Sequence, residues 1–238
     1  MDSNKIKFGS STGGLGDVLL LTSVCKYFPN QFIVQLTPKN SRLSVLFKGL
    51  ADVEICEQNE IKTLQDIGTG HYATRKLRNF FGELADGMDN RPLVLYSSKE
   101  DEAWAYDFLK DKRTPVIFVP TCSKQWASVR NLPENVVFSN LKKIRESGCT
   151  AIVCQSSDNK IQTEEIELDD LPLGKYICLL RRCGFYMGAN TGDEHLATAV
   201  GCKTVVIQPK DGNGFLSAEW NYDHPNSQYY TWHDDNSG

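Results

Sequence analysis

The sequence predicts an α/β protein built from two similar halves, each with a largely parallel sheet covered by helices. Short apolar runs of strand length alternate with segments whose apolar residues recur every three or four positions. The same alternation starts again after a charged stretch at residues 110–114. Strands that alternate with helices form parallel sheets, because each connection crosses back over the sheet. We therefore expect two domains, at residues 1–112 and 113–238.

In the first half, a glycine-rich turn separates the first expected strand from an apolar helix. The turn reads S-S-T-G-G-L-G-D, and the helix is expected at residues 18–28. A later segment has helical spacing at Leu43, Leu46, Phe47 and Leu50. Strands are expected at residues 5–9, where apolar and polar residues alternate, and at three short apolar runs, residues 32–36, 53–56 and 93–96.

The second half repeats the pattern with stronger apolar runs. One helix is marked by Val137, Leu141 and Ile144 and ends at Gly148, and two more are expected around residues 176–182 and after Asp193. The acidic segment 164–170 is expected to be a loop. The aromatic tail, 220–238, is too polar for a core element, so we expect it to pack across both domains or to be partly disordered. Strands are expected at residues 116–119, 151–154, 185–187 and 204–207.

Composition excludes several classes of function. The chain has 238 residues, 40% of them hydrophobic, and a net charge of -4 without a long basic run, so a nucleic acid is not expected as the main partner. No apolar run has the length of a membrane span and no signal peptide is visible, which favours a cytoplasmic protein. The eight cysteines are scattered and form no C-x-x-C pair, so we expect reduced, buried thiols and no metal site.

The segment G-A-N-T-G-D-E-H-L-A-T-A-V-G, residues 188–201, joins an expected strand to an expected helix. The first backbone N–H groups of such a helix can hold an anion such as a diphosphate. Alternatively, Asn190, Thr191 or Asp193 simply caps the helix, which these residue types often do. His195 falls in the first turns of the same helix, either as a core residue or as a ligand contact.

Two further segments carry candidate site residues at the carboxyl ends of strands. Gly13, Gly14 and Gly16 allow a tight turn or close approach of a ligand, but their spacing fits neither a P-loop nor a dinucleotide fingerprint. Asp17 follows them, either as a proton acceptor or as a helix cap. The loop at residues 121–133 offers hydroxyl and cationic groups that bind phosphate or remain solvated; these are Ser123, Lys124, Ser128 and Arg130.

Together the three segments resemble the heptosyltransferase family of inverting glycosyltransferases with the GT-B fold. G-G-L-G-D-V-L-L-L-T-S-V is similar to the family's S-x-G-D-x-L-x-T-x-P segment, and V-P-T-C-S-K-Q-W-A-S-V-R-N-L-P to its H-P-G-A…K-R-W-P loop. M-G-A-N-T-G-D-E-H-L-A-T-A-V-G resembles its V-G-x-D-T-G-x-x-H-L-A-A-A-x-G signature. The resemblance implies two Rossmann-like domains whose parallel sheets face each other across a cleft.

The resemblance also implies roles for individual residues. Asp17 matches the general base, and Arg130 stands where a phosphate-contacting lysine is usual. Asn190 replaces the usual aspartate, Asp193 replaces a small residue or proline, and Leu132 replaces a tryptophan. The donor-binding residues implied in this way are Gly14, Gly16, Ser123, Lys124, Arg130, Asn190, Thr191, Gly192, Asp193 and His195.

The implied reaction is transfer of a hexosyl or heptosyl group from a nucleoside-diphosphate sugar to an acceptor hydroxyl, with inversion. The diphosphate would be stabilised by the helix start after Thr191 together with Arg130 or Lys124, so no metal or other cofactor is expected. A non-catalytic protein that binds nucleotides or sugar phosphates is the alternative. A sugar-nucleotide epimerase fits less well, because we find no second carboxylate to partner Asp17. The acceptor and the oligomeric state stay open.

Overall fold

The computed structural model describes residues 5–10, 14–65, 67, 71–122, 127–209 and 226–232. The described residues form two compact units, one ending at Ser97 and the other beginning at Ser98. Both are α/β units with parallel sheets, as the sequence predicts. Helix α4, Lys99–Leu109, belongs to the second unit, whereas the sequence analysis placed the division after it, at residue 112.

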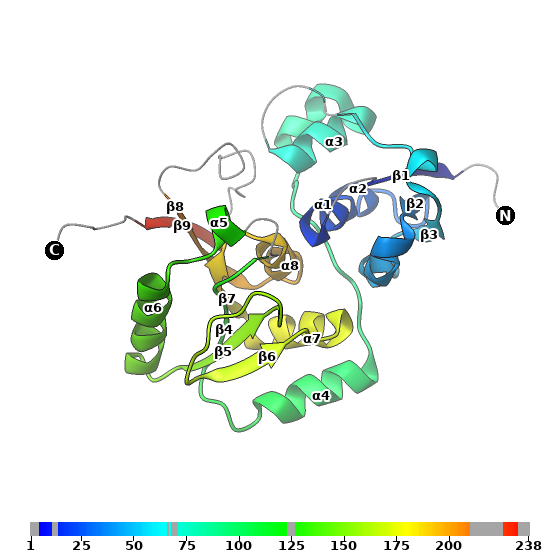
Figure 1. Ribbon diagram of the computed structural model, residues 1–238. Coiled ribbons are helices and arrows are strands. Elements are labelled where there is room, and N and C mark those ends of the chain that lie inside the picture. Colours follow the sequence, from blue (N-terminus) through cyan, green and yellow to red (C-terminus); the bar gives the residue numbers. More distant parts are fainter. Residues whose placement is uncertain are drawn as a thin grey trace. The chain divides into compact units, whose positions relative to one another are not determined.

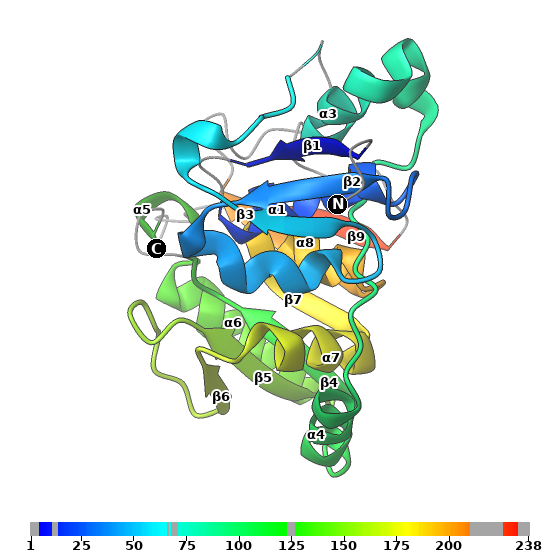
Figure 2. The same cartoon turned by 90° about the vertical axis from the view of Figure 1, so that its right-hand side faces the viewer.

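The first unit contains a three-stranded parallel sheet with β2 in the middle (Figure 2). Its strands confirm the expected runs at residues 5–9, 32–36 and 53–56. The glycine-rich turn leads into two short helices instead of one long helix. The elements are β1 (Ile6–Gly9), α1 (Leu15–Leu20), α2 (Thr22–Cys25), β2 (Phe32–Leu36), a 3-10 helix (Pro38–Phe47), β3 (Asp52–Ile55), a 3-10 turn (Gln58–Glu60), α3 (Tyr72–Phe81) and a further 3-10 helix (Gly82–Gly87).

The strand expected at residues 93–96 was a wrong prediction, because this described segment is a loop. The backbone N–H of Leu93 donates to the Thr22 hydroxyl, 2.9 Å away, at the start of α2. Val94 is buried, but half of the surface of Leu95 is exposed. The apolar run therefore packs as an extended connection against the helix and does not enter the sheet.

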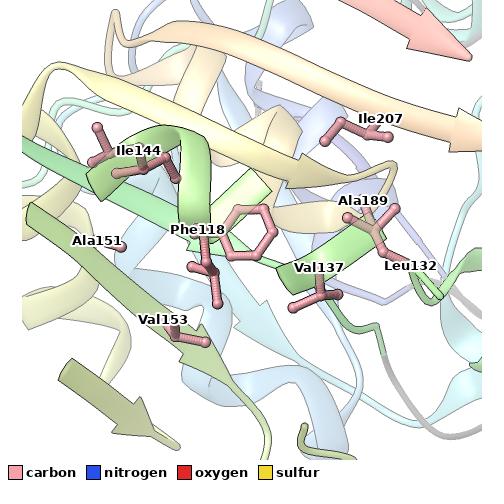
Figure 3. Packing of buried hydrophobic residues seen from close by; sticks show 10 residues of the cluster. Phe118, Leu132, Val137, Ile144, Ala151, Val153, Ala189 and Ile207 are labelled. Atoms are coloured by element: carbon pink, nitrogen blue, oxygen red, sulfur yellow. The ribbon is translucent and has the colours of Figure 1, made fainter. Parts of the chain in front are cut away.

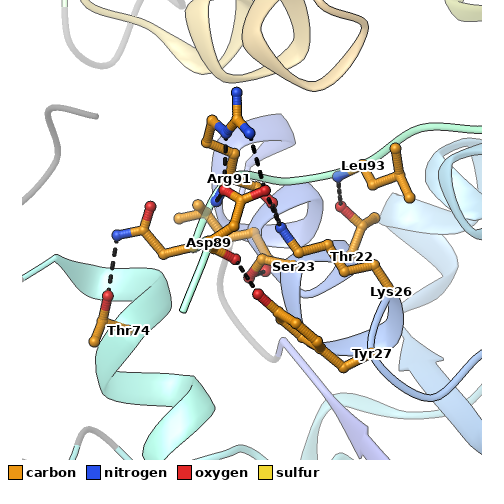
Figure 4. A network of polar contacts seen from close by, with 10 residues as sticks. Thr22, Ser23, Lys26, Tyr27, Thr74, Asp89, Arg91 and Leu93 are labelled. Atoms are coloured by element: carbon orange, nitrogen blue, oxygen red, sulfur yellow. Dashed lines mark hydrogen bonds and ion pairs between the residues drawn. The ribbon is translucent and has the colours of Figure 1, made fainter. Parts of the chain in front are cut away.

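A polar network ties the same connection to the end of α2 (Figure 4). The Asp89 carboxylate accepts hydrogen bonds from Arg91 and lies 3.0 Å from the Lys26 ammonium. The Tyr27 hydroxyl donates to the Asp89 carbonyl at 2.7 Å. Partial burial alone would raise the pKa of Asp89, but the bonds from Arg91 and Lys26 outweigh it and hold the pKa well below its usual range.

The second unit contains a six-stranded parallel sheet in the order β6-β5-β4-β7-β8-β9. In chain order this is the 3-2-1-4-5-6 arrangement of doubly wound dinucleotide-binding domains. From β4 to β6, each later strand lies nearer one edge of the sheet, and from β7 to β9 each lies nearer the other edge. The strands are β4 (Pro115–Val119), β5 (Thr150–Gln155), β6 (Ile166–Asp169), β7 (Phe185–Ala189), β8 (Lys203–Pro209) and β9 (Ser227–Trp232).

Helices cover both faces of this sheet (Figure 1). On one face, α6 (Glu134–Glu146) places Val137, Leu141 and Ile144 against side chains of β4 and β5, as their spacing predicts (Figure 3). On the other face lie α7 (Leu173–Cys183) and α8 (Gly192–Ala199). Side chains alternate between faces along a strand. Apolar residues are therefore buried on both faces of the central strands.

Two edge strands were missed by the sequence analysis. The acidic segment expected as a loop contains β6, whose Glu167 and Asp169 pair with Lys160. The polar tail, expected to cross both domains or be disordered, contains β9, which pairs in parallel with β8. Edge strands tolerate polar and charged side chains because one side of the strand is open. Their sequences therefore lack the apolar run that marks a central strand.

Gly188 of β7 lies opposite Val119 of β4, and we expect its replacement by alanine to destabilise the second unit. An added Cβ would lie 2.3 Å from the Val119 carbonyl oxygen and 3.0 Å from the Tyr186 hydroxyl. Overpacking of this kind costs about 1–3 kcal/mol, so the melting temperature of Gly188→Ala should fall by several degrees. The matched control is Gly14→Ala, since no atom of the described residues lies within 4 Å of its added Cβ. Equal melting temperatures for both variants would contradict the close approach.

All eight cysteines are free thiols, and five of them are buried. The expectation of buried thiols is thus confirmed for Cys25, Cys122, Cys154, Cys178 and Cys202, while the other three are half-buried. Within the described part of the chain, no helix is both long enough and apolar enough to cross a membrane.

Candidate functional site

The second unit has a topological switch point between β4 and β7, where the strand order reverses. The two strands are direct neighbours, with Val119 opposite Gly188. The chain leaves β4 into the loop that carries α5 (Ala127–Arg130), and leaves β7 into Asn190, Thr191 and α8. Doubly wound sheets bind ligands in the crevice at such a point, beyond the carboxyl ends of the strands. Arg130 and residues 190–195 therefore lie on the two segments that bound it.

Thr191 caps α8, so the capping interpretation of this loop is confirmed. Its backbone is extended, and its hydroxyl oxygen accepts from the Asp193 N–H at 3.2 Å. The same hydroxyl donates to the Asp193 carboxylate at 3.0 Å. The helix begins at Gly192, close to the expected start at Asp193. A capped helix start still carries the partial positive charge of the helix dipole, which favours an anion.

The first turn of α8 already contains two carboxyl groups, Asp193 and Glu194. Burial raises the pKa of Asp193, against the opposing effect of the hydrogen bond from the Thr191 hydroxyl. Burial also raises the pKa of Glu194, to about 8, against the opposing effects of the Tyr229 hydrogen bond and the Arg130 charge. Both shifts favour the neutral acid, which is the form that repels a bound anion least.

Glu194 is a site residue that the sequence analysis did not find. Its side chain is fully buried, and one carboxyl oxygen accepts from the Tyr229 hydroxyl of β9 at 2.6 Å. An acidic residue in a first helical turn usually lies in solvent, where it complements the helix dipole. The hydroxyl that bonds to Glu194 comes from β9, which the sequence did not predict. The sequence therefore carries no local signal for this buried group.

The loop after β4 is held in place by two asparagine side chains. The Asn131 side-chain oxygen accepts from the Cys122 N–H at 2.9 Å, and the Asn159 amide donates to the Cys122 carbonyl at 2.7 Å. Arg130 ends α5 on this loop. Its charge opposes the burial that raises the pKa values of Cys122 and Glu194, so the guanidinium lies within electrostatic reach of both groups.

Asn190 and His195 are buried on either side of the cap. The Asn190 amide donates to the Gln208 side-chain oxygen of β8 at 3.5 Å. His195 is a residue of α8, and only 5% of its surface is exposed. The structure thus brings Asn190, Thr191, Gly192, Asp193 and His195 into one turn next to β8. Ser123 and Lys124 lie outside the described residues, as does Gly13.

Asp17, Gly14 and Gly16 lie in the first unit, at the start of α1. The Asp17 carboxylate accepts from the Gly14 backbone N–H at 3.0 Å, so it caps the helix as one of the two interpretations predicts. One carboxylate oxygen is used in this bond, and a carboxylate can accept several more. Gly14 itself is exposed, and within the described part of the chain nothing lies within 4 Å of an added Cβ. Internal packing does not require glycine there.

Solved structures share this fold over nearly the whole chain. A glycosyl transferase family 9 protein from Veillonella parvula has a TM-score of 0.73 at 13% identity, covering 98% of this chain and 88% of its own. ADP-heptose lps heptosyltransferase II from E. coli has 0.69 at 12%, covering 95% and 90%. E. coli heptosyltransferase WaaC with ADP-2-deoxy-2-fluoro heptose has 0.53 at 13%, covering 95% and 92%.

No protein-family model matches the sequence, and no curated protein matches it. At such low identity the structural likeness shows the fold alone. The chain therefore has the GT-B fold of heptosyltransferase-like proteins, with a parallel sheet in each of its two units.

Proposed function

We propose that the protein is an inverting glycosyltransferase that moves a sugar from a nucleoside-diphosphate sugar to an acceptor hydroxyl. The observation that carries the proposal is the α8 turn beside Arg130, at the switch point of the second sheet. The chain shares its fold with structures described as heptosyltransferases, one of them solved with ADP-2-deoxy-2-fluoro heptose. Charge and hydrogen-bond donors at this position suit a diphosphate.

In the proposed reaction, residues of the second unit bind the donor and a residue of the first unit acts as the base. The α8 turn and Arg130 hold the diphosphate, and Asp17 accepts the proton of the acceptor hydroxyl. The hydroxyl oxygen forms a bond to the anomeric carbon as the bond to the diphosphate breaks, so the anomeric configuration inverts. The leaving diphosphate keeps the bonding electrons, and its charge is stabilised by the helix dipole and the guanidinium. The proposal assigns no step to a metal ion.

Asp17 suits the role of base for a chemical reason. It is half-buried, its carboxylate is fixed by the Gly14 N–H, and free lone pairs remain to accept a proton. The other donor-site assignments, Gly14, Gly16, Ser123 and Lys124, are part of the same proposal. So are the hexosyl or heptosyl group of the donor and an acceptor that presents a hydroxyl.

A panel of nucleoside-diphosphate sugars, offered with and without candidate acceptors, tests the proposal. We expect at least one donor to release its nucleoside diphosphate, by transfer to an acceptor or by slow hydrolysis. Chromatographic separation of the nucleotides measures this release. If no donor binds, is hydrolysed or serves in transfer, the proposed function is wrong.

The alternative is a non-catalytic protein that binds nucleotides or sugar phosphates. It is favoured by the replacement of the usual aspartate by Asn190 and by the two carboxyl groups in the first turn of α8. It predicts tight binding of nucleotides without release from any donor. The same panel separates the two functions, because binding and release are measured independently.

A further inference from the structure

Glu194 is a buried ionisable group to which the proposed mechanism assigns no role. It lies in the first turn of α8, and none of its side-chain surface is exposed. One carboxyl oxygen accepts from the Tyr229 hydroxyl at 2.6 Å. The other, Oε2, is buried and has no hydrogen-bond partner among the described residues. An ionised carboxylate with an unsatisfied buried oxygen is costly, so this environment favours the protonated acid.

Charged and titratable groups on three other elements act on Glu194 or respond to its charge. Tyr229 of β9 and Arg130 of α5 favour the ionised form of Glu194. The charge of Glu194 in turn acts electrostatically on Tyr186 of β7. Asp193 and His195 flank Glu194 on α8 itself. Burial outweighs the two favourable partners and sets the pKa of Glu194 at about 8. Glu194 thus changes its charge just above neutral pH.

A nucleoside diphosphate bound at this turn would add negative charge beside the carboxyl group. A like charge disfavours ionisation, so the pKa of Glu194 is higher in the complex than in the free protein. We propose that binding of a nucleoside diphosphate at the start of α8 is coupled to uptake of one proton by Glu194. The inference rests on the proposed function, since it concerns the same site.

The sign of the pH dependence follows from this coupling. Below about pH 7 Glu194 is protonated in both states, so the affinity is independent of its titration. As pH rises through 8, the free protein loses the proton but the complex retains it, and binding weakens. The dissociation constant should rise about five- to tenfold between pH 7 and pH 9. Terminal phosphate groups, with a pKa near 6, are already ionised over this range.

Calorimetric titration measures both the affinity and the proton uptake. ADP, GDP and UDP are titrated at pH 7, and the tightest of them is then used at pH 7 to 9. At pH 8.5, two buffers of different ionisation enthalpy give the number of protons taken up. For the wild-type protein we expect about half a proton or more. The matched variant Glu194→Gln keeps the size and the acceptor oxygen, and should bind with a constant affinity and no uptake.

A second variant covers the case in which Glu194→Gln does not fold. Tyr229→Phe removes the hydrogen bond that favours the ionised carboxylate, so the pKa of Glu194 rises and binding should weaken only at a higher pH. A merely structural role of Tyr229 would change affinity equally at every pH. If the proton were taken up by Asp193, the uptake would persist in Glu194→Gln. This variant therefore distinguishes titration of Glu194 from titration of Asp193.

The outcomes distinguish the inference from the proposed function. A wild-type dissociation constant that is equal at pH 7 and 9, or an uptake that persists in Glu194→Gln, overturns the coupling and leaves donor binding intact. Failure of ADP, GDP and UDP to bind at any pH contradicts the proposed donor site, and the coupling with it.

Discussion

Replacement of Asp17 by asparagine is expected to lower the rate of glycosyl transfer by about 100- to 10,000-fold. A positioned general base contributes a factor of this size, and the amide of asparagine is not a base at neutral pH. The side-chain oxygen of the introduced asparagine can still accept from the Gly14 N–H, so the cap of α1 is retained. The measurement is the turnover rate on whichever donor and acceptor the panel identifies.

The matched control for Asp17→Asn is binding of the nucleoside diphosphate. Because asparagine can keep the bond to the Gly14 N–H that shapes the turn at the start of α1, we expect the dissociation constant of the variant to equal that of the wild type. Thermal unfolding should also be unchanged within about 0.5 kcal/mol. Turnover within a few fold of the wild-type rate would show that Asp17 is only a helix cap.

Replacement of Arg130 by glutamine is expected to weaken binding of nucleoside diphosphates by about 10- to 100-fold. A hydrogen bond to a charged group contributes about 1.5–3 kcal/mol. The Arg130 guanidinium lies on a segment that bounds the switch point, and its charge acts on Glu194. The titration is made at pH 7, where Glu194 is largely protonated. The loss then reports on Arg130 and not on the titration of its neighbour.

The matched variant Arg130→Lys keeps the positive charge and should retain most of the affinity. A lysine cannot form the same bidentate hydrogen bonds to phosphate, so a modest loss of affinity is expected. If Arg130→Gln binds as tightly as the wild type, the guanidinium does not contact the diphosphate. Equal losses in both variants would mean that shape, and not charge, determines the contribution of residue 130.

The central strands could be predicted because their chemistry is local. A parallel strand covered on both faces needs a short apolar run, and β2, β4, β5, β7 and β8 have one. The edge strands β6 and β9 could not be predicted in this way, because an open edge permits charged and aromatic side chains. The run at residues 93–96 led to a wrong prediction for the opposite reason: it is apolar but belongs to a loop, where the Leu93 N–H donates to the Thr22 hydroxyl.

The site was predictable where it depends on loop chemistry, and not where it depends on distant packing. Small polar residues between a strand and a helix indicated the cap at Thr191, which the structure confirms. Glu194 bonds to Tyr229, which lies 35 positions further along the chain on β9, a strand that pairs with β8. No local pattern encodes that contact.

The most direct test of the central claim is thermal unfolding of the wild-type protein with and without nucleoside diphosphates at pH 7. A ligand present at about 100 times its dissociation constant stabilises by about 2.7 kcal/mol, which corresponds to a rise of about 5–10 °C in melting temperature. We expect this rise with at least one of ADP, GDP and UDP, and a much smaller one in Arg130→Gln. An unchanged melting temperature with all three, at millimolar concentration, would contradict the diphosphate site at the start of α8.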